Sequence, residues 1–145
     1  MKNAARIFLF ILSMSVIGCK AFSQEMVPYV LSGEFVMEEN STDYSICGVD
    51  FYLLNKSEKE IKTINIIFFL FDQDGEPASE CRSKVLVEVE KSLAGGESCS
   101  FCLSLDSFMN SVPSSPLMVD YLYLGKIVYE DGTEWNDPYG LVVFK

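Results

Sequence analysis

The chain has 145 residues, with 11 lysines and arginines against 21 aspartates and glutamates, a formal net charge of −10, and no histidine. The missing histidine excludes hydrolases that use a histidine base, and it excludes histidine-ligated metal centres. The acidic balance repels nucleic acid, so we expect no nucleic-acid partner.

Residues 1–23 have the pattern of a signal peptide. A basic start, Met1–Arg6, precedes an apolar run over 7–18. This run is shorter than the roughly 20 residues of a membrane-spanning helix. Small residues before the cleavage point predict processing after Ser23, which leaves 24–145 as a single domain of ordinary size.

A second processing route stays open, because residues 16–19 resemble a bacterial lipobox that ends in a lipid-modified Cys19. In that case alone do we expect a membrane contact. We favour the first route, because residues 20–27 would form a short tether. The predicted location is secreted or periplasmic, in the cell envelope, with a lipid anchor on Cys19 as the alternative.

Alternating apolar side chains predict strands in the first half of the domain. Residues 27–39 are expected to form an edge strand with a kink or bulge at Gly33. Residues 47–53 alternate like a half-buried strand, and 64–71 form an apolar run typical of a strand covered on both faces. The charged turn 55–60 makes these two strands antiparallel neighbours or partners across a sandwich.

The middle of the chain predicts a hairpin followed by a long loop. Residues 85–89 and 99–105 both alternate and are joined by a glycine turn, so we expect them to pair. The irregular stretch 106–116 contains two prolines and is expected to hold one helical turn near Phe108. As a long loop it is a natural place for binding residues.

The last part of the chain completes the strand pattern. Residues 117–130 form one long strand or two segments joined at Gly125, and Asp131-Gly132 predicts a tight hairpin that returns through Trp135. Residues 141–144 are expected to form a final short strand. Seven or eight strands with regularly spaced turns predict an all-β, antiparallel β-sandwich after the signal peptide.

One motif and its flanks resemble a known family. Residues 68–72, FFLFD, are similar to the motif of the FxLYD domain, with Phe71 where the family has tyrosine. An Asn-x-Ser turn at 55–57 and an L-x-x-G-E-like turn at 93–98 agree with it, so the resemblance covers roughly 43–129. The resemblance implies an Ig-like, extracytoplasmic bacterial β-sandwich without a general activity, and it supplies no catalytic residues.

Four cysteines of the mature domain are disulfide candidates: Cys47, Cys81, Cys99 and Cys102. An even number in an exported chain suggests two bridges. Cys99 and Cys102 face opposite sides of a regular strand and cannot easily bridge each other. Our hypothesis joins Cys47 to the strand of Cys99 and Cys102. The C-x-x-C spacing lies among strand residues, which argues against redox chemistry.

Two groups of acidic residues are candidates for chemistry. Asp72, Asp74 and Glu76 resemble half of a calcium loop, but such a loop needs further oxygen ligands. We therefore interpret them as turn residues and predict no metal or cofactor. The carboxylates over 130–134 flank a hairpin rather than a cleft, so we interpret them as solvated and do not expect an enzyme.

The sequence predicts a non-catalytic, exported Ig-like domain of the cell envelope that acts through protein contacts or as a structural module. Its partner would be an envelope or extracellular protein of unknown identity. The alternative is a small-ligand or carbohydrate-binding domain that uses the loop 106–116 or an aromatic face. The residues of that face are Tyr121, Tyr123, Tyr129 and Trp135. At alternate spacing such residues are more often core or cross-strand pairs.

Overall fold

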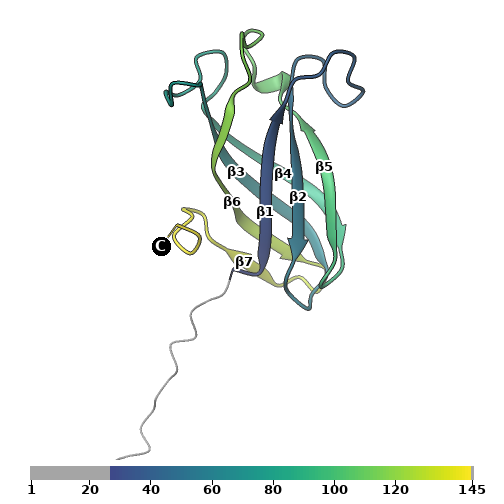
Figure 1. Cartoon of the computed structure of the whole chain (residues 1–145). Coiled ribbons are helices and arrows are strands. Elements are labelled where there is room, and N and C mark those ends of the chain that lie inside the picture. The colour runs from purple at the N-terminus through teal and green to yellow at the C-terminus, as the bar shows by residue number, and fades with distance from the viewer. Residues whose placement is uncertain (1–26, 145) are drawn as a thin grey trace, which may run out of the picture.

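The computed structural model describes residues 27–144 (Figure 1). The predicted signal peptide over 1–23 and the lipidation candidate Cys19 lie outside the described residues. Within that range the elements are β1 (Tyr29–Val36), β2 (Gly48–Asn55), β3 (Ile61–Phe71), β4 (Lys84–Leu93), β5 (Ser98–Ser104), the 3-10 helix η1 (Asp106–Phe108), β6 (Met118–Tyr129) and β7 (Glu134–Asn136).

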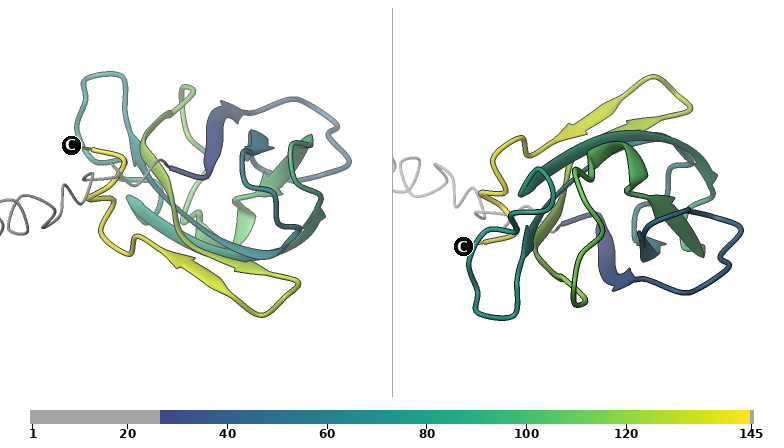
Figure 2. Two further views of the ribbon diagram at one scale, coloured as in Figure 1. Left: turned by 90° about the horizontal axis from the view of Figure 1, so that it is seen from below. Right: turned by 90° about the horizontal axis from the view of Figure 1, so that it is seen from above.

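The strands form two antiparallel sheets, ordered β1-β2-β5 and β4-β3-β6-β7. Views along the strands show the sheets as two separate layers (Figure 2). This arrangement confirms the predicted all-β, antiparallel β-sandwich, with seven strands in the described residues. In an immunoglobulin constant domain the fourth strand lies beside the fifth. Here β4 lies beside β3 instead.

The core between the sheets follows the period-two pattern of the strands. The inward side chains of β3 and β2 are almost completely buried: Ile64, Ile66, Phe68, Leu70, Val49, Phe51 and Leu53. The rings of Phe51 and Phe68 meet edge to face across the layers, with centroids 5.7 Å apart. Burying each such side chain contributes about 1.5–3 kcal/mol. Strands β2 and β3 are therefore partners across the sandwich.

The expected hairpin between residues 85–89 and 99–105 is wrong, because β4 and β5 belong to different sheets. Strand β4 pairs with β3, and β5 pairs with β2. The turn between them crosses the sandwich so tightly that a Cβ on Gly95 would lie 2.8 Å from the carbonyl carbon of Glu58. Alternation identifies the buried face of each strand, but it is the same for neighbours and for partners across the core.

Strand β1 lies at a sheet edge, as predicted, but it has no bulge at Gly33. Its register with β2 is continuous from Tyr29 to Val36. The glycine is needed for packing, since a Cβ at Gly33 would lie 2.8 Å from the Cε1 atom of Phe51. This glycine therefore makes room for a core ring.

The expected final strand over 141–144 is wrong, because these residues form a turn after β7. The buried carboxylate of Asp137 accepts hydrogen bonds from two backbone N–H groups of this turn, at 2.8 and 2.9 Å. The N–H of Phe144 donates to the carbonyl of Gly140 at 3.0 Å. The segment is apolar because Phe144 packs on β6, not because it enters a sheet.

Asn55 ties two chain turns together from inside the protein, and its side chain has no exposed surface. Its amide donates to the carbonyls of Lys59 at 2.7 Å, Leu93 at 3.1 Å and Ala94 at 3.2 Å. Its oxygen accepts from the N–H of Ser57 at 3.0 Å. The Asn-x-Ser signal of the sequence is thus a buried anchor for the turns β2–β3 and β4–β5.

Replacing Asn55 with alanine leaves these buried groups without partners. We expect the free energy of unfolding to fall by about 2–4 kcal/mol, measured by urea denaturation. Asn110→Ala is the matched control, because Asn110 is exposed, and it should change stability by less than about 0.5 kcal/mol. Equal effects of the two substitutions would contradict the anchoring role.

Candidate functional site

Strand β6 contains two bulges that decide which of its side chains face solvent. Its register with β3 shifts between Asn65 and Ile66, where Gly125 is an extra residue in β6. It shifts again between Ile67 and Phe69. Each extra residue reverses the inside-outside alternation. In the middle of β6 the odd-numbered side chains therefore face outward, whereas at its two ends the odd-numbered side chains face the core.

The bulges divide the aromatic face that the sequence suggested. Tyr121 and Tyr123 lie on the outer face of the four-stranded sheet, where both line a groove. Tyr129 is buried in the core, and Trp135 packs edge to face on Tyr29 with centroids 5.6 Å apart. Only two of the four predicted side chains thus lie together in this groove, with Tyr121 52% exposed and Tyr123 5% exposed.

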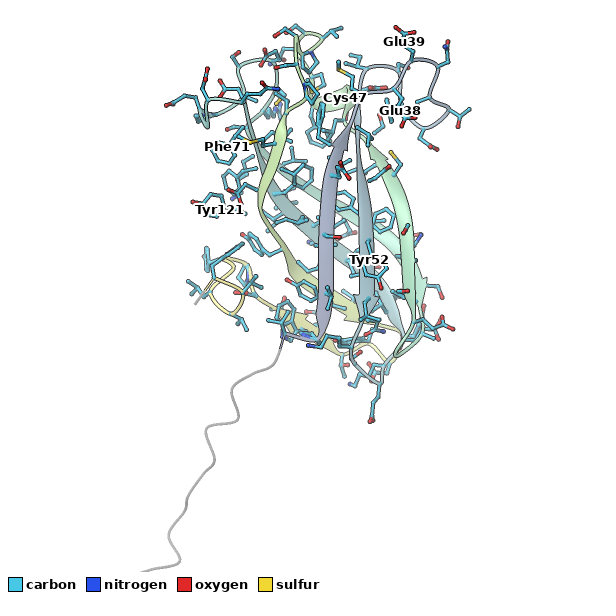
Figure 3. All side chains as sticks on the ribbon, viewed as in Figure 1. Glu38, Glu39, Cys47, Tyr52, Phe71 and Tyr121 are labelled. Carbon is cyan, nitrogen blue, oxygen red and sulfur yellow. The ribbon has the colours of Figure 1, made fainter. Side chains whose placement is uncertain are left out.

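We call the hollow on the outer face of β3 and β6 the aromatic groove. Its volume is about 600 Å³. Its lining residues are Phe69, Phe71, Pro77, Ser83, Lys84, Tyr121, Tyr123, Pro138, Tyr139 and Phe144. The side chains of Phe71 and Tyr121 project from the same side of the sandwich (Figure 3). Lys84 is the one charged residue in this lining.

Tyr121 is the centre of this groove. Its ring centroid lies 5.9 Å from Phe69, 6.2 Å from Phe71 and 5.7 Å from Phe144. Phe144 also lies 5.7 Å from Tyr123. The side chains of Tyr121 and Phe144 are nevertheless 52% and 50% exposed. Tyr121 and Phe144 thus remain about half exposed, while the rings of Phe69, Phe71 and Tyr123 beneath them are partly or fully buried.

The loop over 106–116 is fixed to the rest of the protein at its start. η1 confirms the predicted helical turn near Phe108. The Asp106 carboxylate accepts hydrogen bonds from the backbone N–H groups of Ser45 at 2.7 Å, Ile46 at 2.8 Å and Cys47 at 3.3 Å. These bonds, Ser45 first, lower the pKa of Asp106. The carboxylate of Asp106 therefore joins the start of η1 to the β1–β2 connection, and these hydrogen bonds use it structurally.

The calcium candidates form a capped turn. The carboxylate of Asp72 accepts hydrogen bonds from the N–H groups of Asp74 and Glu76, both at 2.9 Å. Gly75 completes the turn with a φ of 81°. Over residues 27–144 no three acidic, cysteine or histidine side chains gather as metal ligands would. Asp72 thus has a turn-capping role that needs no ion.

The carboxylates over 130–134 form exposed ion pairs at the β6–β7 hairpin. Asp131 lies 2.8 Å from Lys59, and Glu134 lies 2.7 Å from Lys126. The hydrogen bond from Lys59 is the main cause that lowers the pKa of Asp131 to about 2. Ionised, paired and solvated carboxylates of this kind are poor proton donors at neutral pH.

A second hollow, of about 740 Å³, lies on the outer face of β1, β2 and β5. Its lining includes Glu34, Asp43, Asp50, Tyr52 and Cys102. Burial and the neighbouring Asp50 raise the pKa of the Cys102 thiol to about 12, so the thiol stays protonated at neutral pH. This hollow is larger than the aromatic groove, but Glu34, Asp43 and Asp50 make it acidic, and of its rings Phe51 is buried in the core while only Tyr52 is substantially exposed.

The register of β2 and β5 does not bring Cys47 to either of its predicted partners. Cys99 lies opposite Leu53 at the far end of β2, and Cys102 lies opposite Asp50 on the outer face. Cys47 precedes β2 and is buried in the core. No disulfide joins the four cysteines of the described residues in this structure.

Comparisons with protein families, curated proteins and solved structures found no match for this chain. The resemblance to the FxLYD domain therefore stays a prediction from sequence. Among residues 27–144, no helix is long and apolar enough to cross a membrane.

Asp106 should make stability depend on pH. Its folded pKa is lowered, so its contribution is complete above the unfolded pKa of about 3.9 and is lost as pH falls through the folded pKa. We expect Asp106→Ala to cost about 1 kcal/mol at pH 7 and progressively less below pH 4. Urea denaturation at several pH values measures this, with the exposed Ser107→Ala as control. A difference that does not depend on pH would contradict this structural role of Asp106.

Tyr121 has a φ of 47°, in the left-handed region that non-glycine residues avoid. We expect Tyr121→Gly to be about 1 kcal/mol more stable than Tyr121→Ala, because both lose the ring but only glycine relieves the backbone. The same pair at Tyr52, in the regular strand β2, should show the usual opposite order. Urea denaturation of the four variants decides. If Tyr121→Ala is more stable than Tyr121→Gly, the backbone at this bulge is unstrained.

Proposed function

We propose that this protein is a non-catalytic, exported β-sandwich of the cell envelope that works by binding another protein through the aromatic groove. One observation carries the proposal: Tyr121 and Phe144, each about half exposed, pack with the partly buried rings of Phe69 and Phe71 into one aromatic cluster. Proteins that work alone seldom expose contiguous aromatic surface. Tyrosine and phenylalanine are enriched where proteins meet, because they bury much area with few rotatable bonds.

The chemistry of the lining favours a protein partner over a sugar. Sugar recognition needs several convergent polar groups beside the stacking ring. Apart from the tyrosine hydroxyls, the groove offers Ser83 and Lys84, and the ammonium of Lys84 already lies 5.8 Å from the Phe69 ring centroid. The occupant that fits is a segment of an envelope or extracellular protein with apolar side chains.

The export part of the proposal rests on the basic and apolar start of the chain and on its resemblance to the FxLYD domain. The non-catalytic part rests on the absence of histidine from the sequence. It also rests on the roles of the acidic candidates, which cap a turn, brace a loop or form ion pairs. The alternative function, binding of a small ligand or carbohydrate, would use the same rings.

Variants of the groove test the proposal. Tyr139 is 78% exposed, so Tyr139→Ala removes groove surface with little effect on folding. We expect Tyr139→Ala and Tyr121→Ala each to weaken capture of the partner at least about tenfold in pull-downs from native envelope. Tyr52→Ala, 41% exposed on the other sheet, is the matched control and should bind normally.

Two outcomes would overturn the protein-partner assignment. One is capture that is equal for wild type, Tyr139→Ala and Tyr52→Ala, since the groove would then be uninvolved. The other is specific binding on a glycan array that Tyr139→Ala abolishes, which would favour the carbohydrate alternative. A clean negative on the array, together with groove-dependent capture, supports the protein partner.

A further inference from the structure

Cys47 lies at the upper end of the sandwich in Figure 3, and Cys81 belongs to the same buried core cluster. Cys47 has no exposed surface and directly precedes β2 of one sheet. Cys81 is 7% exposed and lies in the connection between β3 and β4 of the other. We propose that these two cysteines form a disulfide in the exported protein, which joins the two sheets covalently.

The turn Leu105–Met109 holds both cysteines. The N–H of Leu105 donates to the carbonyl of Cys47 at 3.0 Å. Cys81 forms an antiparallel bridge with Met109. The two anchor residues are separated by one compact 3-10 turn, so both cysteines are held against the same short segment. This juxtaposition is absent from the sequence pattern, because the turn comes long after both cysteines.

The electrostatics of the thiols agree with this placement. Burial, Asp106 and then Cys81 raise the pKa of Cys47 to about 11. The contribution of Cys81 to this pKa agrees with the placement of both cysteines at this end of the core. Cys99 and Cys102 are not among the groups that act on Cys47.

Forming this bond removes one proton from each thiol and two electrons in total. The acceptor is a protein or small-molecule disulfide of the exported compartment, which is reduced to thiols as two exchange steps make the new sulfur–sulfur bond. At a pKa of about 11 only about one Cys47 thiol in 10⁴ is ionised at pH 7. The bond therefore forms before the core closes. The disulfide requires the export part of the proposed function, but it does not require that the aromatic groove bind a partner.

Peptide mapping tests the connectivity. The full chain is exported into an oxidising periplasm, denatured with N-ethylmaleimide and without reductant, and digested with trypsin. We expect a cross-linked peptide pair that contains Cys47 and Cys81, with N-ethylmaleimide on Cys99 and Cys102. Labelling of all four thiols would overturn the proposal. A link from Cys47 to Cys99 or Cys102 would also overturn it.

Thermal unfolding gives an independent measurement. The bond closes a loop of about 35 residues, so reductant should lower the Tm of the wild type by about 10 °C. The variant Cys47→Ala/Cys81→Ala should show no effect of reductant, whatever its own Tm. The matched control Cys99→Ala/Cys102→Ala should keep the full shift. An equal reductant effect in wild type and Cys47→Ala/Cys81→Ala would contradict the bond.

Discussion

The burial of one face of β3 is the constraint on which the rest of the structure depends. Ile64, Ile66, Phe68 and Leu70 have no contact with solvent, and this is possible only with a second sheet above them. The edge-to-face contact of Phe51 with Phe68 shows which strand supplies the cover. Strand β3 must also be inside its own sheet, so β4 and β6 flank it and no edge of this apolar strand is left open.

The apolar side chains on the outer face of β3 are covered in a different way. Ile67 is buried, although it points away from the core of the sandwich, and a Cβ on Gly125 would lie 2.7 Å from its Cδ1 atom. Further along the strand, Phe69 and Phe71 are covered only in part, by Tyr121. The aromatic groove is therefore the portion of an apolar strand that the protein leaves incompletely covered. A partner protein that completes this cover gains the area that folding has not used.

Alternation in the sequence was enough to predict the fold class and the buried face of β3, because a two-residue period leaves few other ways to bury such a run. It could not predict the aromatic groove. The rings of Tyr121 and Tyr123 face outward only because two bulges in β6 reverse its parity, and a bulge leaves no pattern in a single sequence. Only Gly125 hinted at the first bulge. The position of Phe144 depends on the side chain of Asp137, and the proposed pairing of Cys47 with Cys81 rests on a distant turn.

The order of the strands has a consequence for how the protein acquires its structure. Strand β2 pairs with β5, and β3 pairs with β6. Neither sheet is therefore complete until the last third of the chain is available. Pairings between such distant segments fold slowly compared with local ones. A polypeptide of this kind stays open until its late strands are available, and cysteines that are later enclosed are accessible until then. The strand order thus delays the closing of the core until β5 and β6 are in place.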